Sequence, residues 1–226
     1  MVAAAPGVGK SVMGLRITFT MRVPSLYLAC DSDEDEMLVR TVQMGQNLDQ
    51  ETAERQIAEG GILARQVFEE VDYVRFDFPG NPDIEEIVER TRAFAEASGE
   101  WPQLIVVDNL MDVAWDDGTE REGHNSVMSR LGELARAARA AVLVLAHVTG
   151  QYEDGNQTIP LSGLMNKIGK KPRMVLTICN GSDRQVWVSV LKNRRGNADP
   201  SGLGVRIPLR VDYARMQMGD TLAAVP

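Results

Sequence analysis

Runs of consecutive apolar residues recur along the chain and are separated by stretches with helical spacing. The runs at 24–30, 104–107 and 141–146 predict strands that are buried on both faces of a sheet. A fourth run at 71–76 predicts another strand. Strands of this kind need helices on both sides to keep their side chains from water.

The stretches between the runs supply those helices. A helix is predicted from Ser32 onward, because acidic residues in a first turn favour the helix dipole, and residues 50–71 are helical in pattern with weak periodicity. Two clearer helices have one apolar face each, formed in the first by Ile84, Ile87, Val88, Thr91 and Phe94 and in the second by Val127, Leu131, Leu134 and Ala138.

The order of these elements indicates the fold class. Alternating strands and helices predict an α/β fold with a mainly parallel central sheet flanked by helices. Three closing strands at 173–179, 185–191 and 205–211 have no helices between them, so an antiparallel C-terminal extension is expected. The long irregular stretch is 149–172, and irregular loops of that length are usually functional or disordered.

A phosphate-binding pattern stands near the start of the chain. Residues 4–11 read AAPGVGKS, which fits G-x-x-x-x-G-K-[ST] except that Ala4 replaces the first glycine. Gly7 and Gly9 let backbone N–H groups turn toward phosphate oxygens, Lys10 supplies positive charge, and Ser11 offers a hydroxyl to Mg²⁺. A small-residue turn before a helix is the alternative. We expect the nucleotide to contact Ala5, Pro6, Gly7, Val8, Gly9, Lys10, Ser11 and Val12.

The second half of such a site follows the apolar run at 104–107. Asp108 ends this run, and ligands bind beyond the carboxyl ends of parallel strands. An aspartate there holds Mg²⁺ in phosphate-loop enzymes, through water or together with the loop hydroxyl of Ser11. The alternative is an aspartate that only starts a turn. Together with Lys10 and Ser11, Asp108 favours a site for ATP and Mg²⁺.

The strand before the phosphate loop is short in this sequence. Residues 2–4 supply only its end, whereas strands usually have about five residues. We expect either that the chain starts late or that the sheet tolerates a stub, and we favour the late start.

Composition narrows the classes of protein. The net charge of −8 argues against nucleic-acid binding over the whole surface, but it leaves room for a local basic channel. Cys30 and Cys179 fall in apolar runs and predict core packing in a reducing cytoplasm. No apolar run approaches the length that spans a membrane. His124 has no chemical context and is expected at the surface.

The order of five segments resembles a known family. They are APGVGKS, LYLACDSDEDEM, LIVVDNLMDV, VLVLAHVTG and VSVLKNRRGNADPSG. They look like the RecA-like ATPase core of DnaB-like hexameric replicative helicases, most of all the short versions that bacteriophages encode. The resemblance covers nearly the whole chain and implies a single RecA-like phosphate-loop ATPase domain over 1–226, without the amino-terminal collar domain of cellular helicases.

This resemblance also implies cofactors, partners and a location. It implies ATP and Mg²⁺ as cofactors, single-stranded DNA as partner, and a homo-oligomer, most simply a hexameric ring. The expected location is the cytoplasm, that of the host if a phage encodes the chain, with no membrane contact. A primase or loader cannot be named from the sequence.

Residue roles carry over from the resemblance to matching positions. Asp31 matches the general base that activates the attacking water, usually Glu in the family and here one methylene shorter; Asp33 or Glu34 could substitute. The alternative is that Asp31 caps the next helix. His147 matches a polar position that senses the γ-phosphate, and a structural histidine is the alternative.

Two basic groups complete the set implied by the family. Lys192 and Arg194 match cations that enter a neighbouring subunit's nucleotide site, with Arg195 leaving one place of ambiguity and a basic turn as the alternative. Stretch 149–172 matches a DNA-binding loop, where the alternative is a solvated loop and Tyr152 is the aromatic available for stacking. The cations expected on DNA are Lys167, Lys170, Lys171 and Arg173.

Three functions are therefore weighed. The first is an ATP-dependent helicase or translocase on single-stranded DNA in phage replication, with hydrolysis at the subunit interfaces of a ring. The second is a RecA-like recombinase or recombination mediator, which would exchange strands rather than displace them. The third is a regulator that binds ATP without hydrolysing it, suggested by the shortened base and the short first strand.

Overall fold

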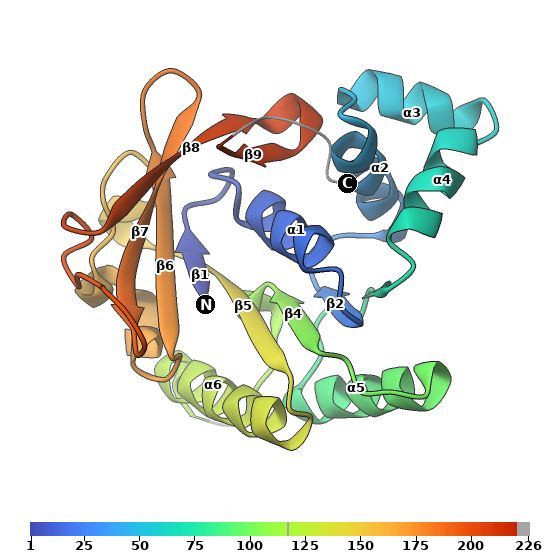
Figure 1. The fold of residues 1–226 in the computed structure, drawn as a ribbon. Helices are drawn as coiled ribbons and strands as arrows, with labels where there is room; N and C mark the ends of the chain where they lie inside the picture. The colour runs from blue at the N-terminus through green and yellow to red at the C-terminus, as the bar shows by residue number, and fades with distance from the viewer. Residues whose placement is uncertain (117, 221–226) are drawn as a thin grey trace.

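A computed structural model of the chain describes residues 1–116 and 118–220 (Figure 1). Its centre is a nine-stranded sheet in the order β3-β2-β4-β5-β1-β6-β7-β8-β9. The strands are β1 Val2–Ala4, β2 Ser25–Ala29, β3 Val74–Asp77, β4 Leu104–Asp108, β5 Ala141–His147, β6 Met174–Asn180, β7 Gln185–Asn193, β8 Arg206–Asp212 and β9 Gln217–Gly219.

Helices cover both faces of this sheet. Helix α1 lies on one face, while α5 and α6 lie on the other (Figure 1). The helices are α1 Lys10–Met21, α2 Glu34–Gln46, α3 Gln50–Ala58, α4 Ile62–Glu70, α5 Ile84–Ser98 and α6 Glu120–Ala137. No helix in the described part of the chain is both long and apolar enough to cross a membrane.

The predicted fold class is confirmed. All neighbouring strands from β3 to β6 pair in parallel, and β6, β7, β8 and β9 follow as an antiparallel extension. The strand β9 was not expected, because three residues are too few to display a periodicity. It pairs with the end of β8 and brings Met218 back toward the start of the chain.

The first strand lies in the middle of the sheet. Val2 of β1 pairs with Leu145 of β5 on one side and with Leu176 of β6 on the other. Its three residues are almost completely buried. A strand as short as the sequence suggested is therefore held by neighbours on both sides, and its carboxyl end leads directly into the phosphate loop.

Two helix boundaries differ from the sequence prediction. Residues 50–71 form the separate helices α3 and α4, because Gly60 and Gly61 between them adopt positive φ angles of 118° and 65°. Helix α2 begins at Glu34 rather than at Ser32. Its cap is Asp33, whose carboxylate accepts a hydrogen bond from the Glu36 N–H at 2.8 Å, so the alternative that Asp31 caps this helix is wrong.

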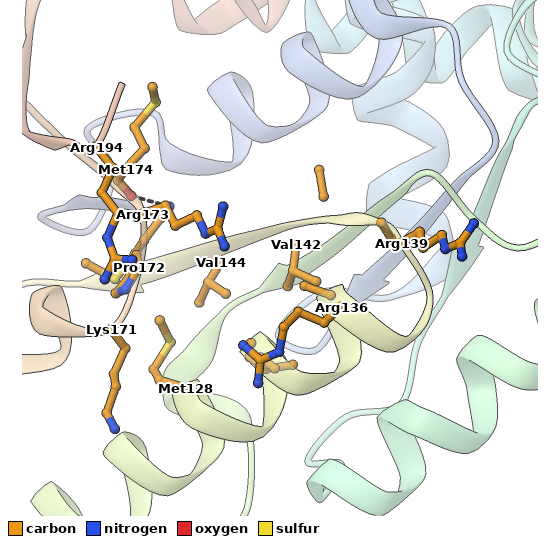
Figure 2. Close-up of a pocket in the computed structure, with 16 residues that line it drawn as sticks. Met128, Arg136, Arg139, Val142, Val144, Lys171, Pro172, Arg173, Met174 and Arg194 are labelled. Atoms are coloured by element: carbon orange, nitrogen blue, oxygen red, sulfur yellow. Dashed lines mark hydrogen bonds between the residues drawn. The ribbon is translucent and has the colours of Figure 1, made fainter. Parts of the chain in front are cut away.

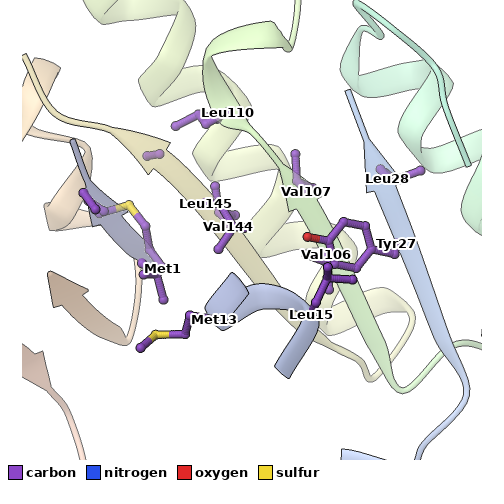
Figure 3. Packing of buried hydrophobic residues seen from close by; sticks show 14 of the residues in the cluster. Met1, Met13, Leu15, Tyr27, Leu28, Val106, Val107, Leu110, Val144 and Leu145 are labelled. Carbon is purple, nitrogen blue, oxygen red and sulfur yellow. The ribbon is translucent and has the colours of Figure 1, made fainter. Parts of the chain in front are cut away.

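The core fills the space between α1 and the parallel strands. Figure 3 shows Leu15 of α1 and Tyr27 of β2 beside Val106 of β4, and all three are fully buried. Cys30 and Cys179 are buried free thiols, as expected.

The prediction for His124 was wrong. Its side chain is only 1% exposed, and it packs edge-on against Trp115 with 4.8 Å between ring centroids. His124 precedes Val127 by three residues and Leu131 by seven, so it lies on the apolar face of α6. Helical spacing therefore buries the imidazole despite its polarity.

The long irregular stretch 149–172 contains three short 3-10 turns. They are Gly150–Tyr152, Leu161–Gly163 and Met165–Lys170. The last turn packs on α6, where the Asn125 side-chain amide donates a 2.8 Å hydrogen bond to the Asn166 carbonyl. The stretch thus runs from the carboxyl end of β5 to the amino end of β6, across the height of the sheet.

Candidate nucleotide-binding site

The loop between β1 and α1 has the geometry of an anion cradle. Gly7 and Gly9 take positive φ angles of 74° and 90°, a region that residues with a Cβ rarely enter. Gly9 caps α1 without any side-chain hydrogen bond. The first N–H groups of a helix have no acceptor inside the helix, so those of α1 are free to bind an anion.

Two distant segments pack closely over this loop. A Cβ placed on Gly9 would lie 2.7 Å from Met218 Cε and 3.0 Å from Tyr213 Cε1. A Cβ on Gly155 would lie 2.5 Å from Val8 Cγ2. The loop therefore rests between the C-terminal hairpin and the irregular stretch 149–172, and only glycine fits at both contact points.

Lys10 is the buried cation of the site. Its side chain is 6% exposed, and its ammonium lies 3.3 Å from His147 Nδ1 at the end of β5. Burial lowers the pKa of Lys10, while the carboxylates of Asp108 and Asp31 raise it. Burial and the nearby Lys10 lower the pKa of His147. A neutral imidazole can accept a hydrogen bond from the ammonium at Nδ1 when its proton is on Nε2.

Asp108 lies where the sequence predicts an acid, at the carboxyl end of β4. It is 2% exposed, and its Oδ2 accepts a 2.7 Å hydrogen bond from the Tyr27 hydroxyl. Burial raises the pKa of Asp108, and the hydrogen bond from Tyr27 opposes that rise. Its other oxygen, Oδ1, is buried and has no hydrogen-bond partner among the described residues.

An orphaned carboxylate oxygen beside the phosphate loop fits a hard cation. Mg²⁺ takes oxygen ligands and usually keeps several waters, so one carboxylate and one hydroxyl from the protein are enough. Ser11, in the first turn of α1, is close enough to lower the pKa of Asp108. Ser11 and Asp108 would hold the ion, which in turn would neutralise charge on bound phosphates.

Asp31 follows β2 at the same edge of the sheet and is exposed. Its Oδ2 accepts a 3.1 Å hydrogen bond from the Asn109 amide, and its Oδ1 accepts one of 3.3 Å from the Ser32 hydroxyl. Asp33, one of the possible substitutes, is occupied as the cap of α2. Among these acids, Asp31 is the one that a residue next to Asp108 orients.

Sequence reasoning missed two residues of this site, Tyr27 and Asn109. Asn109 follows Asp108 directly, and a second polar residue after a buried strand was the available signal. Tyr27 is the one hydroxyl-bearing residue among the apolar residues of β2, so its polarity was visible. Its partner in the neighbouring strand was not, because strand order cannot be read from one sequence.

Two expected catalytic cations lie elsewhere in this chain. β7 runs antiparallel to β6, so Lys192 and Arg194 at its carboxyl end lie at the amino edge of the parallel strands, opposite the phosphate loop. The Lys192 ammonium donates hydrogen bonds to the carbonyls of Gly169 at 3.2 Å and Lys170 at 2.7 Å. Arg194 is exposed.

The basic residues of stretch 149–172 and of the start of β6 are exposed but do not form one cluster. Lys171 and Arg173 line a cavity together with Arg194 (Figure 2). Lys167 belongs to the turn on α6 and has a left-handed φ of 57°. That turn is held by His124, whose Nδ1 lies 3.0 Å from the Asn166 side-chain nitrogen. The DNA contacts expected of Lys167, Lys170, Lys171 and Arg173 stay predictions.

A phosphate loop on β1, a buried acid on β4 and a sheet that carries both at one edge define a P-loop nucleotide-binding protein. The chain belongs to the AAA domain family, whose model matches residues 1–151. It is 35% identical over 232 residues to the Gene 65 protein of Mycobacterium phage D29, covering 98% of this chain and 96% of that protein. The Gene 65 protein of Mycobacterium phage L5 is also 35% identical, with 98% and 83% covered.

Solved structures share the fold at low sequence identity. One of them, an isolated ATPase domain, superposes with a TM-score of 0.83 at 14% identity, over 96% of this chain and 82% of that one. A DnaB-like replicative helicase, studied for its interactions with primase, gives a TM-score of 0.81 at 14% identity, over 96% of this chain and 56% of that one. The resemblance to DnaB-like ATPase domains and to phage relatives is therefore confirmed.

Proposed function

We propose that the chain is an ATP-driven motor on single-stranded DNA that works as a ring, with ATP hydrolysed between neighbouring copies. The observation that carries this proposal is the convergence of Lys10, Asp108 and Asp31 at one edge of a sheet with the fold of DnaB-like ATPase domains. Phage relatives at 35% identity support a role in phage DNA replication.

The chain's own groups would divide the chemistry between them. The N–H groups of the loop and Lys10 bind and orient the phosphates. Asp31 accepts a proton from the attacking water, with its carboxylate held by Asn109. Bound Mg²⁺, held by Ser11 and Asp108, supplies charge neutralisation at the phosphates.

Contacts from the site to the DNA-binding stretch support coupling between ATP and movement. His147 touches Lys10 and ends the strand from which stretch 149–172 departs. Gly155 of that stretch packs against Val8 of the phosphate loop. A change at the γ-phosphate would therefore reach the stretch through His147 and Val8, and the basic residues farther along it would move the DNA.

The placement of Lys192 and Arg194 is compatible with action on a neighbouring copy. Both lie at the edge opposite the phosphate loop of their own chain, so they cannot complete their own site. In a head-to-tail ring they would face the next copy's nucleotide and stabilise charge on the transferred phosphoryl group.

The decisive experiment is steady-state ATP hydrolysis with and without single-stranded DNA. The parent chain should hydrolyse ATP faster with DNA, and Lys10→Ala should abolish turnover, whereas Arg92→Ala on the exposed face of α5 should not. Strand displacement distinguishes a translocase from a recombinase, which would exchange strands.

A matched pair of variants tests the general base. Asp31→Asn should bind ATP and hydrolyse it about 10²–10⁴-fold more slowly. Asp33→Asn should stay active, because asparagine caps a helix as well as aspartate does. ATP binding without turnover in the parent chain, with DNA present, would instead support the non-hydrolysing regulator.

A further inference from the structure

A cavity of about 710 Å³ lies between α6, β5 and the start of β6, on the amino side of the parallel strands (Figure 2). Its floor is apolar and includes Leu131, Val142 and Val144. Its rim carries five cations, and no acid occurs among the described residues that line it. The cations are Arg136, Arg139, Lys171, Arg173 and Arg194.

These five cations are unusual in this chain. All are exposed, and none forms an ion pair with a carboxylate of the described residues, unlike Arg40, Arg90 and Arg130. They gather in a protein whose net charge is −8. Unpaired like charges around an apolar floor repel one another, so a partner with negative charge and apolar contact area would be stabilised there.

One segment of the chain has the complementary character. Residues 31–36 carry five carboxylates, and Glu34 and Asp35 have no ion-pair partner among the described residues. Both also line a second, smaller cavity beside Phe68, Phe76 and Phe78. This segment, which we call the acidic turn, therefore offers negative charge next to apolar surface.

The acidic turn and the cationic cavity lie on different sides of the molecule. The acidic turn leads into α2 near the sheet edge formed by β3, whereas the cavity lies below β5 and β6 (Figure 1). A segment of one copy that fits a distant surface of the next gives a head-to-tail contact, which closes into a ring when the rotation allows it.

We propose that the cationic cavity receives the acidic turn of the next copy in the ring. This inference rests on the proposed function, because that function brings Arg194 to the neighbour's nucleotide site. Asp31 begins the acidic turn at that same site, so the remaining cations around Arg194 would meet the carboxylates that follow Asp31. The contact sets which copy faces which and aligns Arg194 with the nucleotide.

Single-stranded DNA is the competing occupant, since Lys171 and Arg173 were expected to bind phosphate. Phosphate contacts gain nothing from Leu131, Val142 and Val144, whereas an acidic protein segment with neighbouring phenylalanines uses both the rim and the floor. The apolar floor therefore favours a protein segment.

The test exchanges the charges on the two surfaces. One variant, Arg136→Glu with Arg139→Glu, makes the cavity negative; a second, Glu34→Lys with Asp35→Lys, makes the acidic turn positive. Each alone sets like charges against each other. In a non-hydrolysable ATP analogue with Mg²⁺ and an oligothymidylate, each should need an about tenfold or higher concentration to assemble, measured by mass photometry.

Mixing the two variants is the sharp step, because every contact in an alternating ring then joins opposite charges. The mixture should assemble like the parent chain, into particles with an even number of copies, which also shows that both variants are folded. Arg92→Glu on α5 carries a matched charge change outside the cavity and should assemble normally.

The other outcomes overturn the inference. If the parent chain assembles and the separate variants assemble equally well, the cavity does not receive the acidic turn, although the proposed function stands. If those variants assemble normally but Arg136→Glu with Arg139→Glu loses affinity for oligothymidylate, the cavity binds DNA instead. If the parent chain never assembles, the ring and this inference both fail.

Discussion

The hydroxyl of Tyr27 on β2 donates a hydrogen bond of 2.7 Å to Asp108 on the neighbouring strand β4, and both side chains are buried. This bond occupies Oδ2 of the carboxylate and leaves Oδ1 as the oxygen available to a cation. Tyr27 is therefore a positioning residue for the candidate Mg²⁺ ligand, although it is not itself at the phosphate loop.

Tyr27→Phe should destabilise the fold and weaken metal-dependent binding. It leaves a second buried carboxylate oxygen without a donor, which costs about 1–3 kcal/mol of unfolding free energy in urea titrations. Tyr73→Phe is a matched control, because Tyr73 donates a 2.8 Å hydrogen bond to the Phe19 carbonyl away from the site. The Mg²⁺ dependence of ATP binding should change only in Tyr27→Phe. An equal change in both variants would remove the positioning role.

Gly9→Ala should impair nucleotide binding more than it impairs a matched site. Alanine at the left-handed φ of Gly9 costs about 1–2 kcal/mol, and its Cβ also meets Met218 and Tyr213. Gly99→Ala carries the same backbone strain at φ 74° but has open space around it. Calorimetric titration with ATP should show a loss of affinity for Gly9→Ala alone. Normal ATP affinity in Gly9→Ala would mean that the hairpin yields at little cost.

Stability should decrease as the pH falls below about 6.5, the ordinary pKa of histidine. Burial lowers the pKa values of His124 and His147 in the folded chain, so the unfolded chain binds more protons in this range. The unfolding free energy therefore rises with pH, for the buried His124 by at most about 1.4 kcal/mol per pH unit. The contribution of His147 is smaller, because water screens its half-exposed ring.

Urea titrations between pH 7 and pH 5 measure this slope. His124→Gln and His147→Gln should each flatten it, since glutamine does not titrate. Comparing parent and variant at each pH cancels the contribution of Asp108, whose raised pKa acts in the opposite direction. Parallel curves for parent and variants would contradict the assignment.

The cysteines should be inert in the folded chain. Burial, with a smaller effect of Asp112, raises the pKa of Cys30 to about 12, and Cys179 is 3% exposed. A thiol must ionise and meet the reagent to react. Ellman's reagent should therefore label neither cysteine in buffer and both in urea. Rapid labelling without denaturant would show that β2 or β6 opens locally.

The sequence predicted the parts of the site that follow from local pattern. Lys10 and Ser11 lie within one loop motif, and Asp108 ends an apolar run, so neither depends on distant partners. Tyr27 becomes functional only because β2 pairs with β4, and Met218 reaches Gly9 only through β9. These relations arise from strand order and chain reversal, which a single sequence does not encode in its periodicity.

His124 is a different kind of error, because its signal was present. Its spacing from Val127 and Leu131 placed it on the apolar face of α6, but polarity was given more weight than position. The general lesson is that helical spacing decides burial for a single polar residue when the rest of the face is apolar.

The position of β1 has a consequence for how the chain reaches this fold. Val2 needs Leu145 and Leu176 as partners, so the first strand has no place in the sheet until β5 and β6 have been synthesised. Contacts between such distant parts of a chain close slowly, because loop entropy must be overcome first. The nucleotide site is therefore assembled late in folding, and a nascent or partly folded chain holds β2, β3 and β4 before it can bind a phosphate.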